Sequence, residues 1–111
     1  MQDYIVSLPL NQVPAVLCAD CRPDEAERLQ SHYRGEPLIP AATPVHLTQE
    51  RFGAVDKRYF FTLKDQTVTY PRQVAMASTV ALTRTTSMDS YHCPQVTRAS
   101  EFSEKLLALM R

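Results

Sequence analysis

The sequence predicts a small α+β protein in which two helices pack on an antiparallel sheet. Alternating apolar residues predict a hairpin or meander around residues 59–84, and helix signals mark residues 23–34 and 100–110. A chain of 111 residues is the usual size of one domain, and it contains no repeat, low-complexity tract or linker. We therefore expect one globular domain over residues 1–111.

The first expected element is a short strand at residues 4–8. Tyr4, Val6 and Leu8 alternate with Ile5 and Ser7, the two-residue period of a strand. Pro9 ends the pattern.

The next expected element is a helix over residues 23–34. Pro23 suits the first helical position, where a missing N–H costs nothing, and Gly35 is a suitable stop. The acidic residues of its first turn fit the positive end of the helix dipole: Asp24, Glu25 and Glu27. That explanation leaves them no need of a catalytic role.

Residues 36–58 contain three prolines and no sustained period, so at most a short strand at 45–48 is expected. Two strand patterns follow: RYFFTL at 58–63 and TVTY at 67–70. The short polar stretch at 64–66 between them predicts an antiparallel hairpin.

The stretch PRQVAMASTVALTRT, residues 71–85, is ambiguous. Its alanines favour a helix, whereas its large aliphatic residues all fall on even positions: Val74, Met76, Val80 and Leu82. Because that spacing is the period of a strand, we favour a further strand and keep the helix as the alternative.

The last element is a helix at about 100–110, with Ser100 as N-cap. Glu101 and Glu104 lie in its first turn, and one face carries Phe102, Leu106, Leu109 and Met110.

Composition excludes several classes of protein. Twelve basic and twelve acidic side chains balance, so no strong nucleic-acid binding is expected. No apolar run approaches the ~20 residues that cross a bilayer, so no membrane association is expected. Three cysteines are an odd number, which favours reduced thiols and a cytoplasmic location.

The stretch VLCADC places Cys18 and Cys21 three residues apart before the helix. They supply half of a zinc site that His92 and Cys93 would have to complete, although neighbouring residues of a strand diverge. A cysteine pair at a helix N-terminus also fits a thiol-redox site. We favour the simpler interpretation, in which Cys18 is a small buried residue and Cys21 lies at the helix entrance.

Two other stretches carry candidate site residues. Residues 83–92 gather hydroxyl groups beside Asp89 and His92, the groups of a nucleophile and its base, but no glycine-rich nucleophile elbow organises them. A polar loop is expected there. Residues 50–61 mix basic and aromatic side chains, and we take Arg58, Phe60 and Phe52 as candidate interface residues.

By elimination, the sequence predicts a small non-enzymatic interaction module without a cofactor. Such a module would bind a partner protein or self-associate, as inhibitors, immunity proteins and adaptors of mobile genetic elements do. One alternative is a zinc-binding domain that uses Cys18 and Cys21 with Cys93 or His92. Further alternatives are a small thiol-redox protein and a small enzyme whose site the sequence does not reveal.

Overall fold

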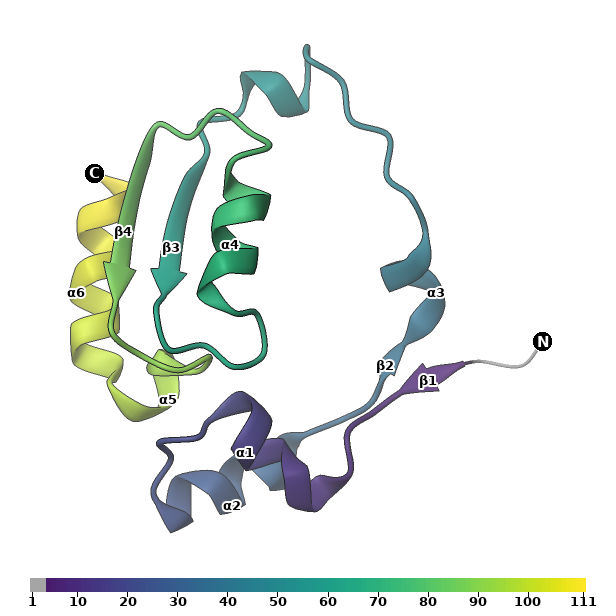
Figure 1. Cartoon of the computed structure of the whole chain (residues 1–111), viewed down its shortest axis with the longest axis vertical. Coiled ribbons are helices and arrows are strands. Elements are labelled where there is room, and N and C mark those ends of the chain that lie inside the picture. Colours follow the sequence, from purple (N-terminus) through teal and green to yellow (C-terminus); the bar gives the residue numbers. More distant parts are fainter. Residues whose placement is uncertain (1–3) are drawn as a thin grey trace.

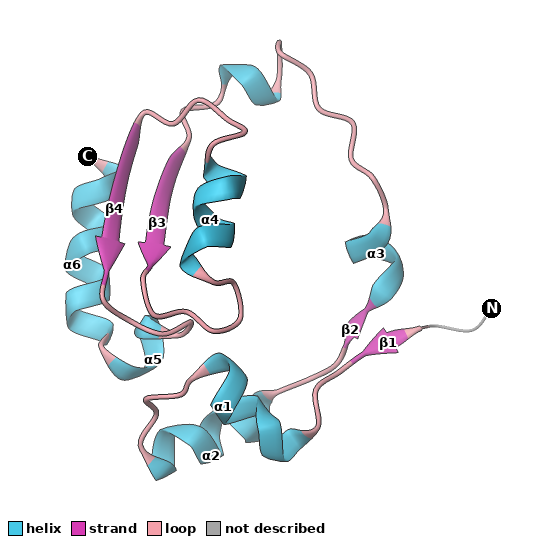
Figure 2. Ribbon diagram, in the orientation of Figure 1, coloured by secondary structure: helices cyan, strands magenta, loops and turns pink. Residues whose placement is uncertain are grey.

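The computed structural model describes residues 4–111, and it combines helices with two small two-stranded sheets (Figures 1 and 2). The expected α+β class is confirmed. The elements, in chain order, are β1 (Ile5–Val6), η1 (Leu10–Gln12), α1 (Val13–Leu17), α2 (Pro23–His32), β2 (Glu36–Pro37), α3 (Leu38–Ala42), η2 (Phe52–Ala54), β3 (Arg58–Thr62), α4 (Tyr70–Ala77), β4 (Arg84–Met88), α5 (Pro94–Thr97) and α6 (Ala99–Met110).

The second half of the chain is built around β3 and β4, which pair in parallel from Arg58 opposite Arg84 to Thr62 opposite Met88. Parallel neighbours need a crossover connection, and α4 supplies it. The two strands therefore run in the same direction, as the arrows in Figure 2 show.

Helices cover both faces of this small sheet. The ring of Phe60 lies 5.2 Å from that of Phe102 on α6, and the ring of Phe61 lies 5.7 Å from that of Tyr70 on α4. Because successive strand residues point to opposite faces, α6 and α4 pack on opposite sides of β3. Covered faces are typical of parallel sheets.

The predicted antiparallel hairpin or meander around residues 59–84 is wrong. Residues 67–70 form no second strand; they lead into α4, and the partner of β3 is the later β4. The favoured strand over residues 71–85 is also wrong for its first part, which is helical. The helix buries Gln73 and Ala77, four residues apart, and leaves Val74 and Met76 exposed. The apolar periodicity predicted a strand because the buried face of α4 is formed by a polar residue and a small one, which leave no apolar helical stripe in the sequence.

The two helix predictions are confirmed. The first runs over Pro23–His32 and the last over Ala99–Met110. The last helix begins at Ala99, so Ser100 lies inside it and is not the N-cap. Leu109 is buried as expected, whereas Met110 is 66% exposed.

The first half of the chain is more open. The strand expected at residues 4–8 is limited to β1, which pairs antiparallel with β2. The short strand expected at residues 45–48 does not form. The radius of gyration is 16.2 Å, larger than the ~13 Å of a compact chain of this length. Figure 1 shows the reason, since residues 36–56 arch away from the β3–β4 unit.

In the part of the chain from residue 4 onward, none of the helices combines the length and apolar character that crossing a membrane demands.

Candidate functional site

Two titratable side chains meet where β3 and β4 end. Asp65 follows β3 by three residues and His92 follows β4 by four. Because the strands are parallel, their carboxyl ends share one edge of the sheet. His92 Nδ1 lies 2.8 Å from Asp65 Oδ2, a hydrogen bond between residues that are 27 positions apart in the sequence.

Asp65 is held by four hydrogen bonds. Its Oδ1 accepts from the backbone N–H groups of Thr67 at 2.8 Å and Val68 at 3.0 Å, and its Oδ2 accepts from the Thr62 hydroxyl at 2.8 Å and from His92. The Asp65 side chain is 3% exposed. Four donors around a buried carboxyl group fix its orientation and favour its charged form.

The pKa of Asp65 reflects that competition. Burial on its own raises the pKa, but hydrogen bonds from His92, Val68, Thr62 and Thr67 outweigh it and hold the pKa below its ordinary value. Asp65 is therefore an anion at neutral pH, and its carboxylate accepts hydrogen bonds from N–H and O–H groups.

The hydrogen bond to Asp65 sets the tautomer of His92. A carboxylate has no proton to give, so Nδ1 carries the hydrogen and donates it. Nε2 of the neutral ring is then an acceptor, and within residues 4–111 no hydrogen bond engages it. The side chain is 35% exposed. This arrangement leaves a basic nitrogen open to a ligand.

His92 lines a pocket of about 420 Å³, a volume in the range of small-molecule sites. The first half of the chain supplies most of its wall, and Thr67 accompanies His92 from the second half. The other lining residues are Val6, Leu8, Leu17, Tyr33, Glu36, Pro37, Leu38 and Ala41. The pocket is therefore mainly apolar, with the imidazole as its chemically reactive group.

Two hydrogen bonds tie this wall together. The Thr67 hydroxyl donates to the Val16 carbonyl at 2.7 Å, which joins the Asp65 loop to α1. The Tyr33 hydroxyl accepts from the Leu8 N–H at 2.8 Å, which joins the end of α2 to the segment after β1. The pocket is thus built from segments far apart in the sequence.

The hydroxyl groups expected around residues 83–92 do not form a nucleophile with His92. Ser90 is 1% exposed, and its Oγ is buried without a hydrogen-bond partner among the described residues. A substrate cannot reach it. Asp89 pairs with Lys64 at 3.2 Å, so the partner of His92 is Asp65.

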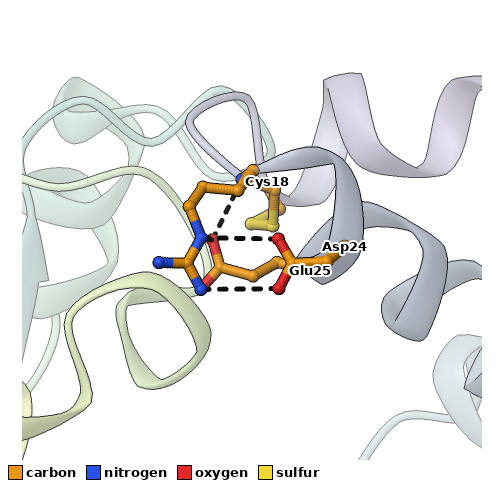
Figure 3. The surroundings of a disulfide bond; sticks show 5 residues. Cys18, Asp24 and Glu25 are labelled. Carbon is orange, nitrogen blue, oxygen red and sulfur yellow. Dashed lines mark hydrogen bonds and ion pairs between the residues drawn. A yellow bond between two sulfur atoms is a disulfide. The ribbon is translucent and has the colours of Figure 1, made fainter.

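The predicted cysteine sites are rearranged. Cys18 and Cys21 form a disulfide, which corrects the expectation of reduced thiols and leaves neither residue a thiolate for zinc. Figure 3 shows Asp24 and Glu25 beside the disulfide, and both pair with Arg22. As expected, Cys18 is buried.

The other proposed zinc ligands, Cys93 and His92, do not complete a metal site with the cysteine pair. Cys93 is a buried free thiol, and His92 is bonded to Asp65. Burial, with the negative charges of Asp65 and Asp20, raises the pKa of Cys93. Among residues 4–111, no group of three or more His, Cys, Asp or Glu side chains is placed to hold a metal ion. The zinc alternative is therefore unsupported.

The candidate interface residues have partners within the chain. Phe60 is half-buried against Phe102. Arg58 pairs with Asp56 at 2.7 Å, and its guanidinium also bonds the Leu109 carbonyl. Phe52 remains 37% exposed beneath Lys57. Their role in an interface stays a prediction.

Sequence reasoning missed Asp65 because a hairpin turn explained it. A signal was present: Asp65 follows one strand pattern closely, and His92 follows the next strand. In a parallel sheet these positions converge, but an antiparallel pairing of the two strands would have separated them.

Comparison with known proteins places this geometry on a known fold. No family model and no curated protein matches the sequence. A crystal structure of polyneuridine aldehyde esterase superposes with a TM-score of 0.82 at 16% identity, covering 99% of this chain and 48% of that one. A histidine-to-alanine mutant of that esterase gives 0.82 at 15% identity, with the same coverage.

The chain thus spans about half the length of the esterase structures that it matches. At this identity the likeness establishes the fold. It also contradicts the prediction of a non-enzymatic interaction module, because the structures that this chain resembles are of an esterase, and the chain has the fold of about half of that structure.

Proposed function

We propose that this chain supplies the acid–base pair of an ester-hydrolysing site. The hydrogen bond of 2.8 Å between His92 Nδ1 and the buried Asp65 carboxylate carries the proposal. Asp65 holds the imidazole in one tautomer and orientation, and Nε2 acts as the general base. The esterase fold supports this assignment.

The nucleophile is proposed to be a serine hydroxyl outside this chain. The sequence has only two glycines, Gly35 and Gly53, so it contains no Gly-x-Ser-x-Gly turn. Ser90 is too deeply buried to react with substrate. The free side of His92 Nε2 is where such a hydroxyl would hydrogen-bond.

The reaction balances with one mobile proton. The hydroxyl oxygen attacks the ester carbonyl carbon while its proton passes to His92 Nε2. The tetrahedral intermediate then expels the alcohol, which takes that proton from Nε2 and leaves an acyl ester. Water repeats the sequence, releasing the carboxylic acid and restoring the serine, and Asp65 stays ionised throughout.

The pocket beside His92 indicates the class of ester. Aliphatic side chains such as Val6, Leu17 and Leu38 favour an uncharged, apolar acyl or alcohol group. Glu36 also lines the pocket, and its negative charge disfavours esters that carry a free carboxylate. We therefore propose small neutral esters as substrates.

The pair can be tested in the isolated chain with p-nitrophenyl acetate, because an imidazole hydrolyses this activated ester without a serine. His92→Gln is expected to lower the rate at least about 10-fold relative to the unchanged protein. His46→Gln, which alters an exposed histidine, is the matched control and should leave the rate unchanged. Equal losses in the two variants would overturn the proposed role of His92.

The serine is tested in the source organism with a fluorophosphonate probe, which labels activated serines. An antibody to this chain should recover a labelled serine that is either continuous with the chain or bound to it. In cells that carry His92→Gln, labelling should fall by ~100-fold or more. Labelling that survives this substitution would show that His92 is not its base.

A further inference from the structure

Gln73 is a buried polar residue in the middle of α4. Its side chain is 2% exposed, although α4 offers larger apolar residues that remain outside. Its Oε1 accepts from the Thr62 N–H at 3.0 Å, and its Nε2 donates to the Thr62 carbonyl at 2.8 Å and the Val68 carbonyl at 2.7 Å. The amide is therefore hydrogen-bonded at both ends, as a buried polar group must be, and its partners show what it holds in place.

The backbone groups that Gln73 binds lie on the outer edge of β3. The Leu63 N–H donates to the Met88 carbonyl of the neighbouring strand. Since backbone groups alternate along a strand, Thr62 directs its N–H and C=O away from β4. The Gln73 amide therefore occupies the place that another strand would take at Thr62.

The same amide reaches the candidate site through one hydroxyl. Nε2 of Gln73 lies 3.2 Å from Thr62 Oγ1, and that hydroxyl lies 2.8 Å from Asp65 Oδ2. A carboxylate only accepts, so the Thr62 hydroxyl gives its hydrogen to Asp65. Its lone pair accepts, at the longer distance, a Gln73 Nε2 hydrogen that is shared with a carbonyl oxygen. The Asp65 oxygen that the hydroxyl binds is the one that receives the His92 N–H.

Gln73 also holds the other side of the carboxylate. Its bond to the Val68 carbonyl fixes the loop whose Thr67 and Val68 N–H groups donate to Asp65 Oδ1. Both oxygens of Asp65 are thus oriented by groups that Gln73 binds.

We propose that Gln73 is a positioning residue for the Asp65–His92 pair. It fixes the Thr62 hydroxyl and the 65–68 loop, which together aim Asp65 Oδ2 at His92 Nδ1. The inference rests on the proposed function for its catalytic meaning, but the hydrogen bond is measurable without any hydrolysis.

The test is NMR of the full chain with ¹⁵N-labelled histidine, which reports the hydrogen on His92 Nδ1 and its exchange with water. Gln73→Met keeps the length of the side chain and removes its polar contacts. It should accelerate exchange of this hydrogen about 10-fold and that of the Thr67 and Val68 amides likewise, while the amides of α6 keep their protection. An unchanged His92 signal in the folded variant would overturn the inference.

Gln30→Met is the matched control, because Gln30 is a glutamine on α2 whose side-chain amide hydrogen-bonds, among residues 4–111, only the Leu10 carbonyl. It should leave the His92 signal as it is. If Gln30→Met accelerated exchange as much as Gln73→Met, the effect would reflect a general loss of stability, and the positioning role of Gln73 would be overturned.

If Gln73→Met fails to fold, Thr62 decides the question. Thr62→Val removes the hydroxyl but leaves the backbone groups that Gln73 binds, and it should accelerate exchange of the His92 hydrogen as well. Thr62→Ser should restore slow exchange. A Thr62→Val signal identical to that of the unchanged protein would overturn the relay.

The two proposals fail separately. Slow, Gln73-dependent exchange without His92-dependent ester hydrolysis would support the positioning and contradict the proposed function. Hydrolysis that depends on His92 while Gln73→Met leaves the His92 signal unchanged would overturn the positioning alone.

Discussion

The two halves of this chain differ in where their apolar side chains lie. Residues 57–111 enclose Met88, Leu109 and Cys93 between two strands and their helices, together with the buried polar residues of the site. In residues 4–56, Val13 and Cys18 are the buried hydrophobic residues, and large side chains such as Tyr4 and Ile39 are exposed. The second half is a scaffold with its own core, whereas the first half supplies a wall.

That difference fits a division of roles. A hydrogen-bonded pair such as Asp65 and His92 must be held within a few tenths of an ångström, which needs rigid elements on all sides. A wall that contacts an apolar ligand needs surface area more than precision. The following measurements test whether stability and rigidity are divided in this way.

The largest expected effect is on the core of the second half. Met88 is 1% exposed at the end of β4, so Met88→Ala should lower the free energy of unfolding by about 2–5 kcal/mol. Leu47→Ala, at a residue 55% exposed in the first half, should cost less than about 0.5 kcal/mol. Chemical denaturation of both variants measures the contrast, and similar losses would contradict it.

The next effect concerns the disulfide of the first half. Because Cys18 and Cys21 are three positions apart, the loop that they close is short and its entropic stabilisation is about 2 kcal/mol. Replacing both by Ala should increase hydrogen exchange in α1 and α2. The amides of β3 and β4 should keep their protection, and a loss there would show that the two halves are not separable.

A smaller effect is expected in acid. The pKa of Asp65 is lowered in the folded protein, so Asp65 contributes stability that is fully present above the ordinary value of 3.8 and is lost as the pH falls through the lowered pKa. Denaturation from pH 6 to pH 2 should therefore show a loss that Asp65→Asn reduces. Asp24→Asn is the control from the first half; its side chain is 68% exposed, and it should leave the profile nearly unchanged.

The smallest effect is on the reactivity of Cys93. Burial raises its pKa, with the charges of Asp65 and Asp20 acting in the same direction, so little thiolate forms at neutral pH. Alkylation by iodoacetamide at pH 7 should be at least about 10-fold slower than that of free cysteine. Rapid alkylation of the folded protein would show that this part of the second half opens readily.

Some of the fold was predictable because its signals are local. Pro23 and the acidic residues after it mark the start of α2, and the spacing of Phe102, Leu106 and Leu109 predicts α6. These features act within a few residues and need no knowledge of distant partners. The α4 helix was missed because its buried side is formed by Gln73 and Ala77, which carry no apolar stripe.

The candidate site could not be predicted in the same way. His92 was singled out, but with Asp89 and nearby hydroxyls as its companions, since sequence proximity was the only guide. The partner that the structure gives it, Asp65, looked like part of a turn. The pairing of Asp65 with His92 depends on the direction in which β4 runs beside β3, and no local pattern encodes that direction.

The sequence by itself determined the α+β class, the helices α2 and α6 and the absence of a nucleophile elbow. Each of these depends on residue type at short spacing. The tertiary structure alone decided that β3 and β4 run parallel, that Cys18 and Cys21 are joined, and that Asp65 meets His92. The physical reason is that residues distant in sequence become neighbours only when the faces of β3 are covered by α4 and α6, which fixes the crossover and brings the two strand ends to one edge.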